Sequence, residues 1–115
     1  MRVRRRFDFE AAHRLPGHPG KCRDLHGHSY ILTVTVERAV EAHSGMAIDF
    51  GDLKRVVSSE VVEPLDHKYI NDILDNPTAE VMAVWIWNRL AAVLPGLDEI
   101  ELHETARCSV VYRGE

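Results

Sequence analysis

Three histidines in the first quarter of the chain have the residue type and spacing of metal ligands. His26 and His28 are separated by one glycine, and His13 precedes them at the end of another apolar segment. Residues two apart on a strand point to the same side, so His13 can join this pair if its strand lies beside theirs. Three neutral imidazoles leave one position of a tetrahedral zinc ion open, which is typical of catalytic sites. The alternative is three unrelated histidines, because a His-x-His pair alone is weak evidence.

Cys22 is a candidate catalytic thiol. It lies in a loop rich in glycine and proline, four residues before His26 and between two basic residues. Positive neighbours and a nearby metal favour the reactive thiolate. The alternatives are an ordinary exposed cysteine, or a fourth zinc ligand that closes the site. The second cysteine, Cys108, alternates with Val110 and Tyr112, so we expect it to be a buried structural thiol.

Two acidic residues complete the set of candidate site residues. Asp66 directly precedes His67, and a carboxylate beside an imidazole can orient or charge the ring for proton transfer. The alternative is a polar segment at a helix exit. Glu104 continues the apolar face set by Ile100 and Leu102, where a carboxylate is unfavourable unless it is paired. It could make two parallel hydrogen bonds to an amidine-like edge of a ligand, unless the strand has already left the core at this point.

The elements that must position these residues form an α+β pattern. Two strands are predicted over residues 3–13 and 26–38, joined by a loop over residues 14–24. A helix over residues 49–62 begins at Asp49 and is ended by Pro64, and a second helix begins at Thr78 and stops before Pro95. Two further strands follow around residues 100–104 and 108–112. The order ββααββ predicts a four-stranded antiparallel sheet with two helices on one face.

Length, charge and composition restrict the class of protein. The chain has 115 residues, which fits a single domain over residues 1–115 and makes association with further copies plausible. A net charge of -4 argues against general nucleic-acid binding, which needs clustered positive charge. No apolar stretch approaches the ~20 residues that span a membrane. Without a secretory signal or a disulfide framework, a cytoplasmic location is expected.

The chain contains several ordered motifs: Phe9-Glu10-Ala11-Ala12-His13, Cys22-x-x-x-His26-Gly27-His28, Leu65-Asp66-His67-x-x-Ile70-Asn71, Asn76-Pro77-Thr78-x-Glu80, Glu104-Thr105 and Tyr112-Arg113-Gly114-Glu115. Together they resemble one known family, the 6-pyruvoyl-tetrahydropterin synthase superfamily. The resemblance extends from about residue 7 to the end of the chain. Only three residues separate Cys22 from His26, whereas pyruvoyl-forming relatives usually have a longer insert, so the carboxy-forming branch is favoured.

The resemblance implies a role for each candidate residue. It assigns His13, His26 and His28 as ligands of Zn²⁺, and Cys22 as the catalytic proton acceptor. Asp66 and His67 would form a proton relay, and Glu104 and Thr105 would bind the pterin, with Glu104 sometimes grouped with the relay. The fold implied is the T-fold, in which several subunits, six by resemblance, join their sheets into a barrel. Active sites then lie at subunit interfaces.

The reaction implied is the conversion of 7,8-dihydroneopterin triphosphate to 6-carboxy-5,6,7,8-tetrahydropterin, acetaldehyde and triphosphate, a step of 7-deazaguanine and queuosine biosynthesis. Three alternatives remain at this point. The first is a pyruvoyl-forming or aldolase-type pterin enzyme on the same fold. The second is a non-catalytic zinc-binding module, and the third is a zinc hydrolase, although the chain lacks a His-Glu-x-x-His helix.

Overall fold

The computed structural model describes residues 1–115 and is built on a long antiparallel hairpin. Strand β1 (Arg2–His13) pairs with β2 (His26–Glu37) along its whole length, and the register places His13 opposite His26 and Ala11 opposite His28. Alternate side chains of both strands, such as Phe9 and Tyr30, are buried under the helices. The hairpin therefore provides seven of the 19 buried residues of the hydrophobic core, and its closed end carries the three histidines.

The sheet has five strands and is mixed, so the predicted four-stranded antiparallel sheet is wrong in this detail. The strand order is β3-β1-β2-β4-β5, in which β4 (Leu97–His103) and β5 (Ser109–Tyr112) pair antiparallel as expected. The additional strand, β3 (Lys68–Tyr69), pairs in parallel with Ala11 and Ala12 of β1. Two residues are too few to show a strand periodicity in the sequence, and only the exposed edge of β1 makes this segment a strand.

The first helical region is longer than predicted and changes its winding. It consists of α1 (Phe50–Val57), a π-helical turn (Ser58–Val62) and α2 (Glu63–Leu65). As predicted, it begins at Asp49, whose carboxylate accepts hydrogen bonds from the backbone N–H groups of Gly51 and Asp52. Leu53, Val57, Val61 and Leu65 are fully buried, so the helix keeps one face on the core despite the π-turn.

Pro64 does not end this helix, because a neighbouring side chain takes over the hydrogen bond that proline cannot make. Pro64 has no N–H to donate to the carbonyl of Glu60, one turn earlier. Arg89 Nε donates to that carbonyl at 2.7 Å, and a second guanidinium nitrogen lies 3.2 Å from the Glu60 carboxylate. The helix therefore continues to Leu65, and the prediction of a stop at Pro64 is corrected.

Helix α3 (Ala79–Ala91) starts where predicted, at Thr78, whose hydroxyl accepts a hydrogen bond from the N–H of Val81. Its sequence is apolar on several sides, so periodicity alone does not choose the face that is buried. The structure buries Met82, Ala83, Ile86 and Leu90, whereas Val81 and Val84 are exposed. Packing of α3 against the sheet and against the first helical region determines which of its faces is buried.

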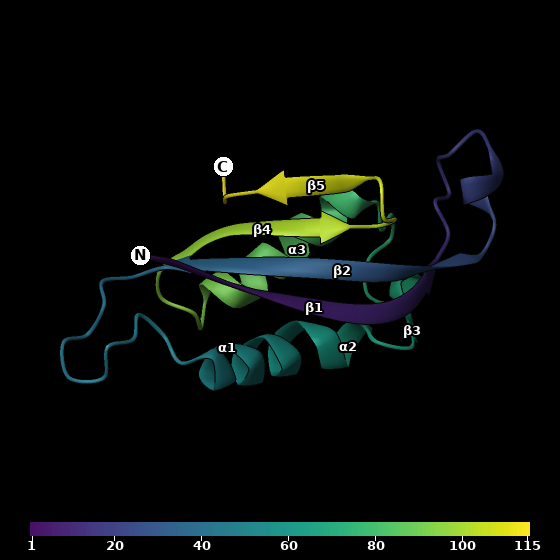
Figure 1. The fold of residues 1–115 in the computed structure, drawn as a ribbon. Coiled ribbons are helices and arrows are strands. Elements are labelled where there is room, and N and C mark those ends of the chain that lie inside the picture. The colour runs from purple at the N-terminus through teal and green to yellow at the C-terminus, as the bar shows by residue number, and fades with distance from the viewer.

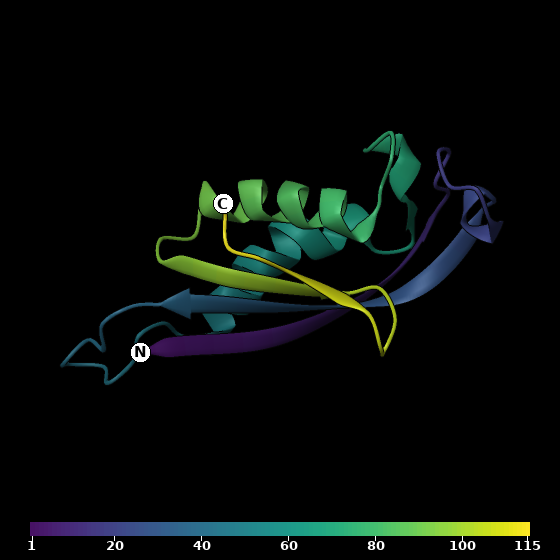
Figure 2. The same cartoon turned by 90° about the horizontal axis from the view of Figure 1, so that it is seen from above.

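All helices lie on one face of the sheet, as the sequence predicts (Figure 1). Figure 2 shows that the far end of the β1–β2 hairpin curves toward the same side as the helices. The opposite face of the sheet carries the charged side chains of β1 and β4, including an ion pair between Arg2 and Asp98. None of the helices has the length and apolarity needed to cross a bilayer.

Candidate metal centre

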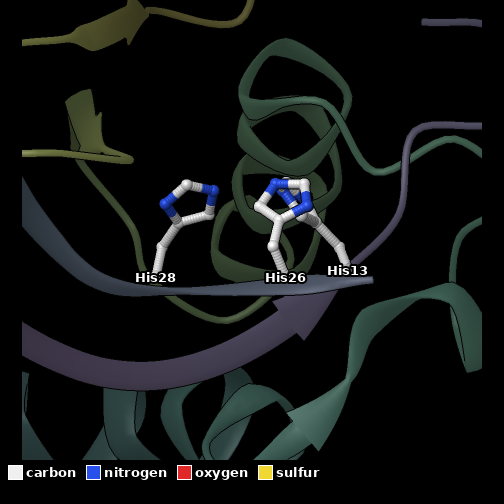
Figure 3. A group of neighbouring side chains, drawn as sticks. All are labelled: His13, His26 and His28. Atoms are coloured by element: carbon white, nitrogen blue, oxygen red, sulfur yellow. Dashed lines mark hydrogen bonds between the residues drawn. The ribbon is translucent and has the colours of Figure 1, made fainter. Parts of the chain in front are cut away.

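His13, His26 and His28 converge at the curved end of the sheet. The register of β1 and β2 brings them together, and their rings rise from the same side of the two strands (Figure 3). One ligand nitrogen from each residue lies within 4.8 Å of the others. His13 is fully buried, and His26 and His28 are partly buried. The convergence expected from strand pairing is therefore present.

Backbone carbonyls fix the orientation of two of the rings. His13 Nδ1 lies 2.8 Å from the carbonyl oxygen of Pro77, and His26 Nδ1 lies 2.7 Å from that of Asp24. Because a carbonyl can only accept, each Nδ1 carries the proton and each Nε2 carries a lone pair. The two Nε2 atoms face each other at 3.0 Å. Two lone pairs at this distance suit a cation bound beside both.

His28 supports the same interpretation. Its Nε2 atom is buried and has no hydrogen-bond partner, and such an unsatisfied group in a folded protein calls for a ligand or an ion. Burial lowers the pKa of His28 and of His13. For His13 the hydrogen bond to Pro77 partly opposes this effect, while the nearby His26 adds to it. The lowered pKa values favour the neutral imidazole, which is the form that binds metal.

Glu104 lies beside the same imidazoles. It follows β4 by one residue and shares the face of Ile100 and Leu102, as predicted, because those two side chains are fully buried beneath the helices. Its Oε1 atom is 3.5 Å from His13 Nε2 and 3.6 Å from His28 Nε2. The carboxylate therefore borders the histidine cluster, although Glu104 is not among the residues whose ligand atoms all lie within 4.8 Å of one another.

Thr105 shapes the turn that carries Glu104. Its hydroxyl accepts hydrogen bonds from the backbone N–H groups of Arg107 and Cys108, at 3.3 and 3.1 Å, and the N–H of Glu104 donates to the carbonyl of Cys108. Cys108 itself is exposed, so the prediction of a buried structural thiol is wrong. It precedes β5 by one residue and sits in the turn, where no helix covers it.

Cys22 does not belong to the metal-ligand group. It is half-buried in a short 3-10 turn (Lys21–Arg23) within the loop between β1 and β2. Its sulfur is not among the ligand atoms that lie within 4.8 Å of one another. The structure thus contains a three-histidine group and not the closed arrangement with Cys22 as fourth ligand.

Asp66 and His67 contact each other, and both are held against β1. The Asp66 carboxylate lies 3.0 Å from His67 Nδ1 and accepts a hydrogen bond from the N–H of Glu10, while the His67 N–H donates to the Glu10 carbonyl. These bonds keep His67 in the left-handed region at φ 57°, which is uncommon outside glycine. The Glu10 and His67 hydrogen bonds lower the pKa of Asp66, so its carboxylate stays ionised.

The side chain of His67 points away from the protein interior and is 77% exposed. It borders a hollow of about 510 Å³. The β1 and β2 side chains that line this hollow, Glu10, Ala12 and Ser29, alternate with the buried ones. These side chains point to the sheet face opposite to the one from which the three histidines rise, although His28 also contributes to the lining of the hollow. Within one chain, His67 and the metal centre therefore lie mainly on different faces of the sheet.

Some contributors to the site were not predicted from the sequence. The carbonyls of Pro77 and Asp24 orient two imidazoles, and the side-chain amide of Asn71 both donates to and accepts from the backbone of Arg14, next to His13. Backbone carbonyls leave no signal in a residue pattern, but Asn71 and Pro77 stand in motifs that the resemblance already contained. Glu80 lines a hollow of about 220 Å³ together with Glu104.

Comparison with known proteins agrees with the sequence motifs. The family model described as 6-pyruvoyl tetrahydropterin synthase matches residues 2–115. The chain belongs to this family. The predicted resemblance is therefore confirmed, and so is the prediction of a lyase of this family.

Individual relatives include both branches of the family. A Synechocystis protein named 6-carboxy-5,6,7,8-tetrahydropterin synthase is 42% identical over 117 residues, covering 96% of this chain and 91% of the relative. A human protein named 6-pyruvoyl tetrahydrobiopterin synthase is 37% identical over 134 residues, covering 98% and 91%. The structure of Caenorhabditis elegans 6-pyruvoyl tetrahydropterin synthase superimposes with a TM-score of 0.91 at 27% identity, covering 100% of this chain and 96% of that chain.

Proposed function

We propose that this family member converts 7,8-dihydroneopterin triphosphate and water to 6-carboxy-5,6,7,8-tetrahydropterin, acetaldehyde and triphosphate. The observation that carries the proposal is the meeting of three imidazole Nε2 atoms and the Glu104 carboxylate at one end of the sheet. The Synechocystis relative named for this product is similar over almost the whole chain. We infer that the reaction belongs to 7-deazaguanine and queuosine biosynthesis and takes place in the cytoplasm.

The three histidines would hold Zn²⁺ through their Nε2 atoms. A bound zinc ion acts as a Lewis acid and lowers the pKa of the hydroxyl groups that it contacts. The protein orients two of the ligands in advance. The Pro77 and Asp24 carbonyls accept the Nδ1–H of His13 and of His26, which leaves the Nε2 atom of each ring free to bind the metal. Burial lowers the pKa of His13 and of His28, which favours the neutral, metal-binding form of these two imidazoles.

The proton transfers fall to Cys22 and His67. The Cys22 thiolate removes a proton from a carbon of the substrate side chain, and His67 exchanges the proton needed on the opposite side of the substrate. Asp66 holds the Nδ1 side of the His67 ring at 3.0 Å, which leaves Nε2 free for proton transfer. Because His67 and the histidine cluster open on different faces, we infer that Cys22 and His67 of one active site come from different subunits of a homo-oligomer, a hexamer on the family pattern.

The pterin ring is held by carboxylates. Glu104 is the predicted anchor for the amino and ring N–H edge, with Thr105 supporting the turn that carries it. Glu80 lies in the first turn of α3 and lines the same hollow, and it makes no hydrogen bond or ion pair within the chain. It is therefore a second candidate for bidentate contact with the pterin edge.

The carboxy-forming branch is favoured over the pyruvoyl-forming one by loop length. The Synechocystis alignment spans 117 positions and the human alignment 134, for nearly the same share of this chain. The alignment with the carboxy-forming relative therefore contains fewer insertions and deletions. This agrees with the short spacing between Cys22 and His26.

The decisive experiment is identification of the product by mass spectrometry after incubation of the zinc-loaded protein with 7,8-dihydroneopterin triphosphate. We expect 6-carboxytetrahydropterin together with acetaldehyde in equal amounts. A pyruvoyl product without acetaldehyde would assign the chain to the other branch, and an unchanged substrate would favour a non-catalytic zinc-binding module.

A further inference from the structure

The carboxylate of Glu104 faces the Nε2 atoms of two of the imidazoles that would hold the metal. Its Oε1 atom is 3.5 Å from His13 Nε2 and 3.6 Å from His28 Nε2, and both distances are too long for good hydrogen bonds. His13 has no proton to offer at Nε2, because its Nδ1–H donates to the Pro77 carbonyl. The oxygen and the two nitrogens thus converge with no hydrogen bond between them, and a cation among them would satisfy all three.

Three of the distances between these atoms are close to those around a single tetrahedral ion. Ligand atoms about 2.0–2.1 Å from a tetrahedral zinc ion lie about 3.3 Å from one another. The distances in the cluster are 3.0 Å from His13 Nε2 to His26 Nε2, 3.5 Å from His13 Nε2 to Glu104 and 3.6 Å from His28 Nε2 to Glu104. These three distances lie around the ideal value. Glu104 is not among the residues whose ligand atoms all lie within 4.8 Å of one another, so its carboxylate would have to move toward His26 to complete the tetrahedron.

We propose that Glu104 is the fourth ligand of the metal ion in the substrate-free enzyme, and that substrate displaces it. This inference rests on the proposed function only in that the histidines hold a metal. The Glu104 backbone is fixed by its hydrogen bond to Cys108 and by the Thr105 turn, but its side chain is 27% exposed. The carboxylate can therefore leave the metal while the turn stays in place, and then take part in binding the pterin.

The test is reconstitution of the protein with Co²⁺, whose visible absorption reports the ligand set. We expect Glu104→Gln to bind Co²⁺ at least about tenfold more weakly than wild type and to show a changed spectrum. The matched control is Glu80→Gln, which removes the same charge from the same hollow and should retain the wild-type affinity and spectrum. Glu104→Asp keeps the charge but shortens the reach, so its affinity should fall as well.

Adding 7,8-dihydroneopterin to the Co²⁺ proteins tests displacement. The wild-type spectrum should change when the carboxylate leaves, and the wild-type and Glu104→Gln spectra should then become alike. The inference is overturned if Glu104→Gln or Glu104→Asp keeps the wild-type affinity and spectrum, if Glu80→Gln has the same effect, or if dihydroneopterin leaves the wild-type spectrum unchanged. Failure of the proposed reaction is separate, since it is judged from the products of the zinc enzyme.

Discussion

The tautomers of two of the three candidate metal-binding imidazoles are decided by carbonyl groups outside the metal-ligand group. Pro77 lies just before the N-cap of α3, and its carbonyl holds the His13 ring, while Asp24 does the same for His26. His28 has no such partner, and its Nε2 is buried and unsatisfied. It is therefore the ligand whose role can be tested with least disturbance to the backbone.

His28→Ala should lose the metal. The remaining two imidazoles form an incomplete site, and we expect zinc affinity to fall by about 100-fold or more, since even outer contacts to a metal site contribute 10- to 100-fold. Elemental analysis of the purified variant measures zinc per chain. His43→Ala, which removes an exposed histidine from the loop before α1, is the matched control and should keep full occupancy. Full zinc content in His28→Ala would exclude this residue as a ligand.

Cys22→Ala should separate catalysis from metal binding. The thiol lies outside the ligand group, so zinc content should remain at the wild-type level. Loss of a positioned base should reduce turnover by about 10²- to 10⁴-fold, measured as acetaldehyde release from the triphosphate substrate. Turnover within a few-fold of wild type would show that another group accepts the proton.

At the scale of elements, the first helical region depends on α3 for its continuity through Pro64. Arg89 donates to the carbonyl of Glu60 that proline leaves free, and its guanidinium also stacks over Trp85 at 4.9 Å. The π-turn and the proline would each weaken an isolated helix. Here the Arg89 side chain links α3 to the first helical region at the π-turn that precedes Pro64.

Arg89→Met should lower the free energy of unfolding by about 1–2 kcal/mol, because it removes one hydrogen bond and a cation–π contact. In a Pro64→Ala background the loss should be smaller by about 0.5 kcal/mol or more, since alanine restores an N–H for the Glu60 carbonyl. Urea unfolding of wild type, the two single variants and the double variant, all at one protein concentration, gives the coupling free energy between Arg89 and Pro64. Equal losses in both backgrounds would mean that Arg89 does not compensate for Pro64.

At the scale of the whole molecule, the chain separates its proposed catalytic groups. The imidazoles lie on the helix-covered face, whereas His67 borders the hollow on the other face, at the edge of the sheet. The outer edge of β5 and most of the outer edge of β1 have no partner strand, and such edges favour pairing with another chain. Both observations support the proposal of an oligomer with shared active sites.

Mixing two inactive variants tests this sharing. Cys22→Ala and His67→Ala, unfolded together and refolded as mixed oligomers, should recover about one quarter of wild-type activity if each site takes these residues from different chains. Each variant refolded alone serves as the control and should stay inactive. No recovery in oligomers shown by mass spectrometry to be mixed would place both residues of a site on one chain.

The sequence by itself determined the identity of the metal-ligand candidates and the main elements that carry them. The strong alternation of apolar and polar residues predicted β1 and β2. The N-cap residues Asp49 and Thr78 located both helix starts to within one residue, because helix capping is a local signal. The motifs around Cys22, His26 and Asp66 identified the family. The face occupied by Glu104 was also correct, since two-residue periodicity continues from Ile100 past the end of β4.

Tertiary structure alone decided the rest, because each remaining feature depends on contact between segments far apart in the chain. Lys68 and Tyr69 form a strand because the edge of β1 is free to pair with them. The helix continues past Pro64 because Arg89 donates a hydrogen bond to the carbonyl of Glu60. Cys108 is exposed because no helix covers its turn. The convergence of His13 with His26 and His28, and the position of Glu104 within 3.6 Å of two of them, follow from strand register. Residue spacing along one segment carries no information about register between segments.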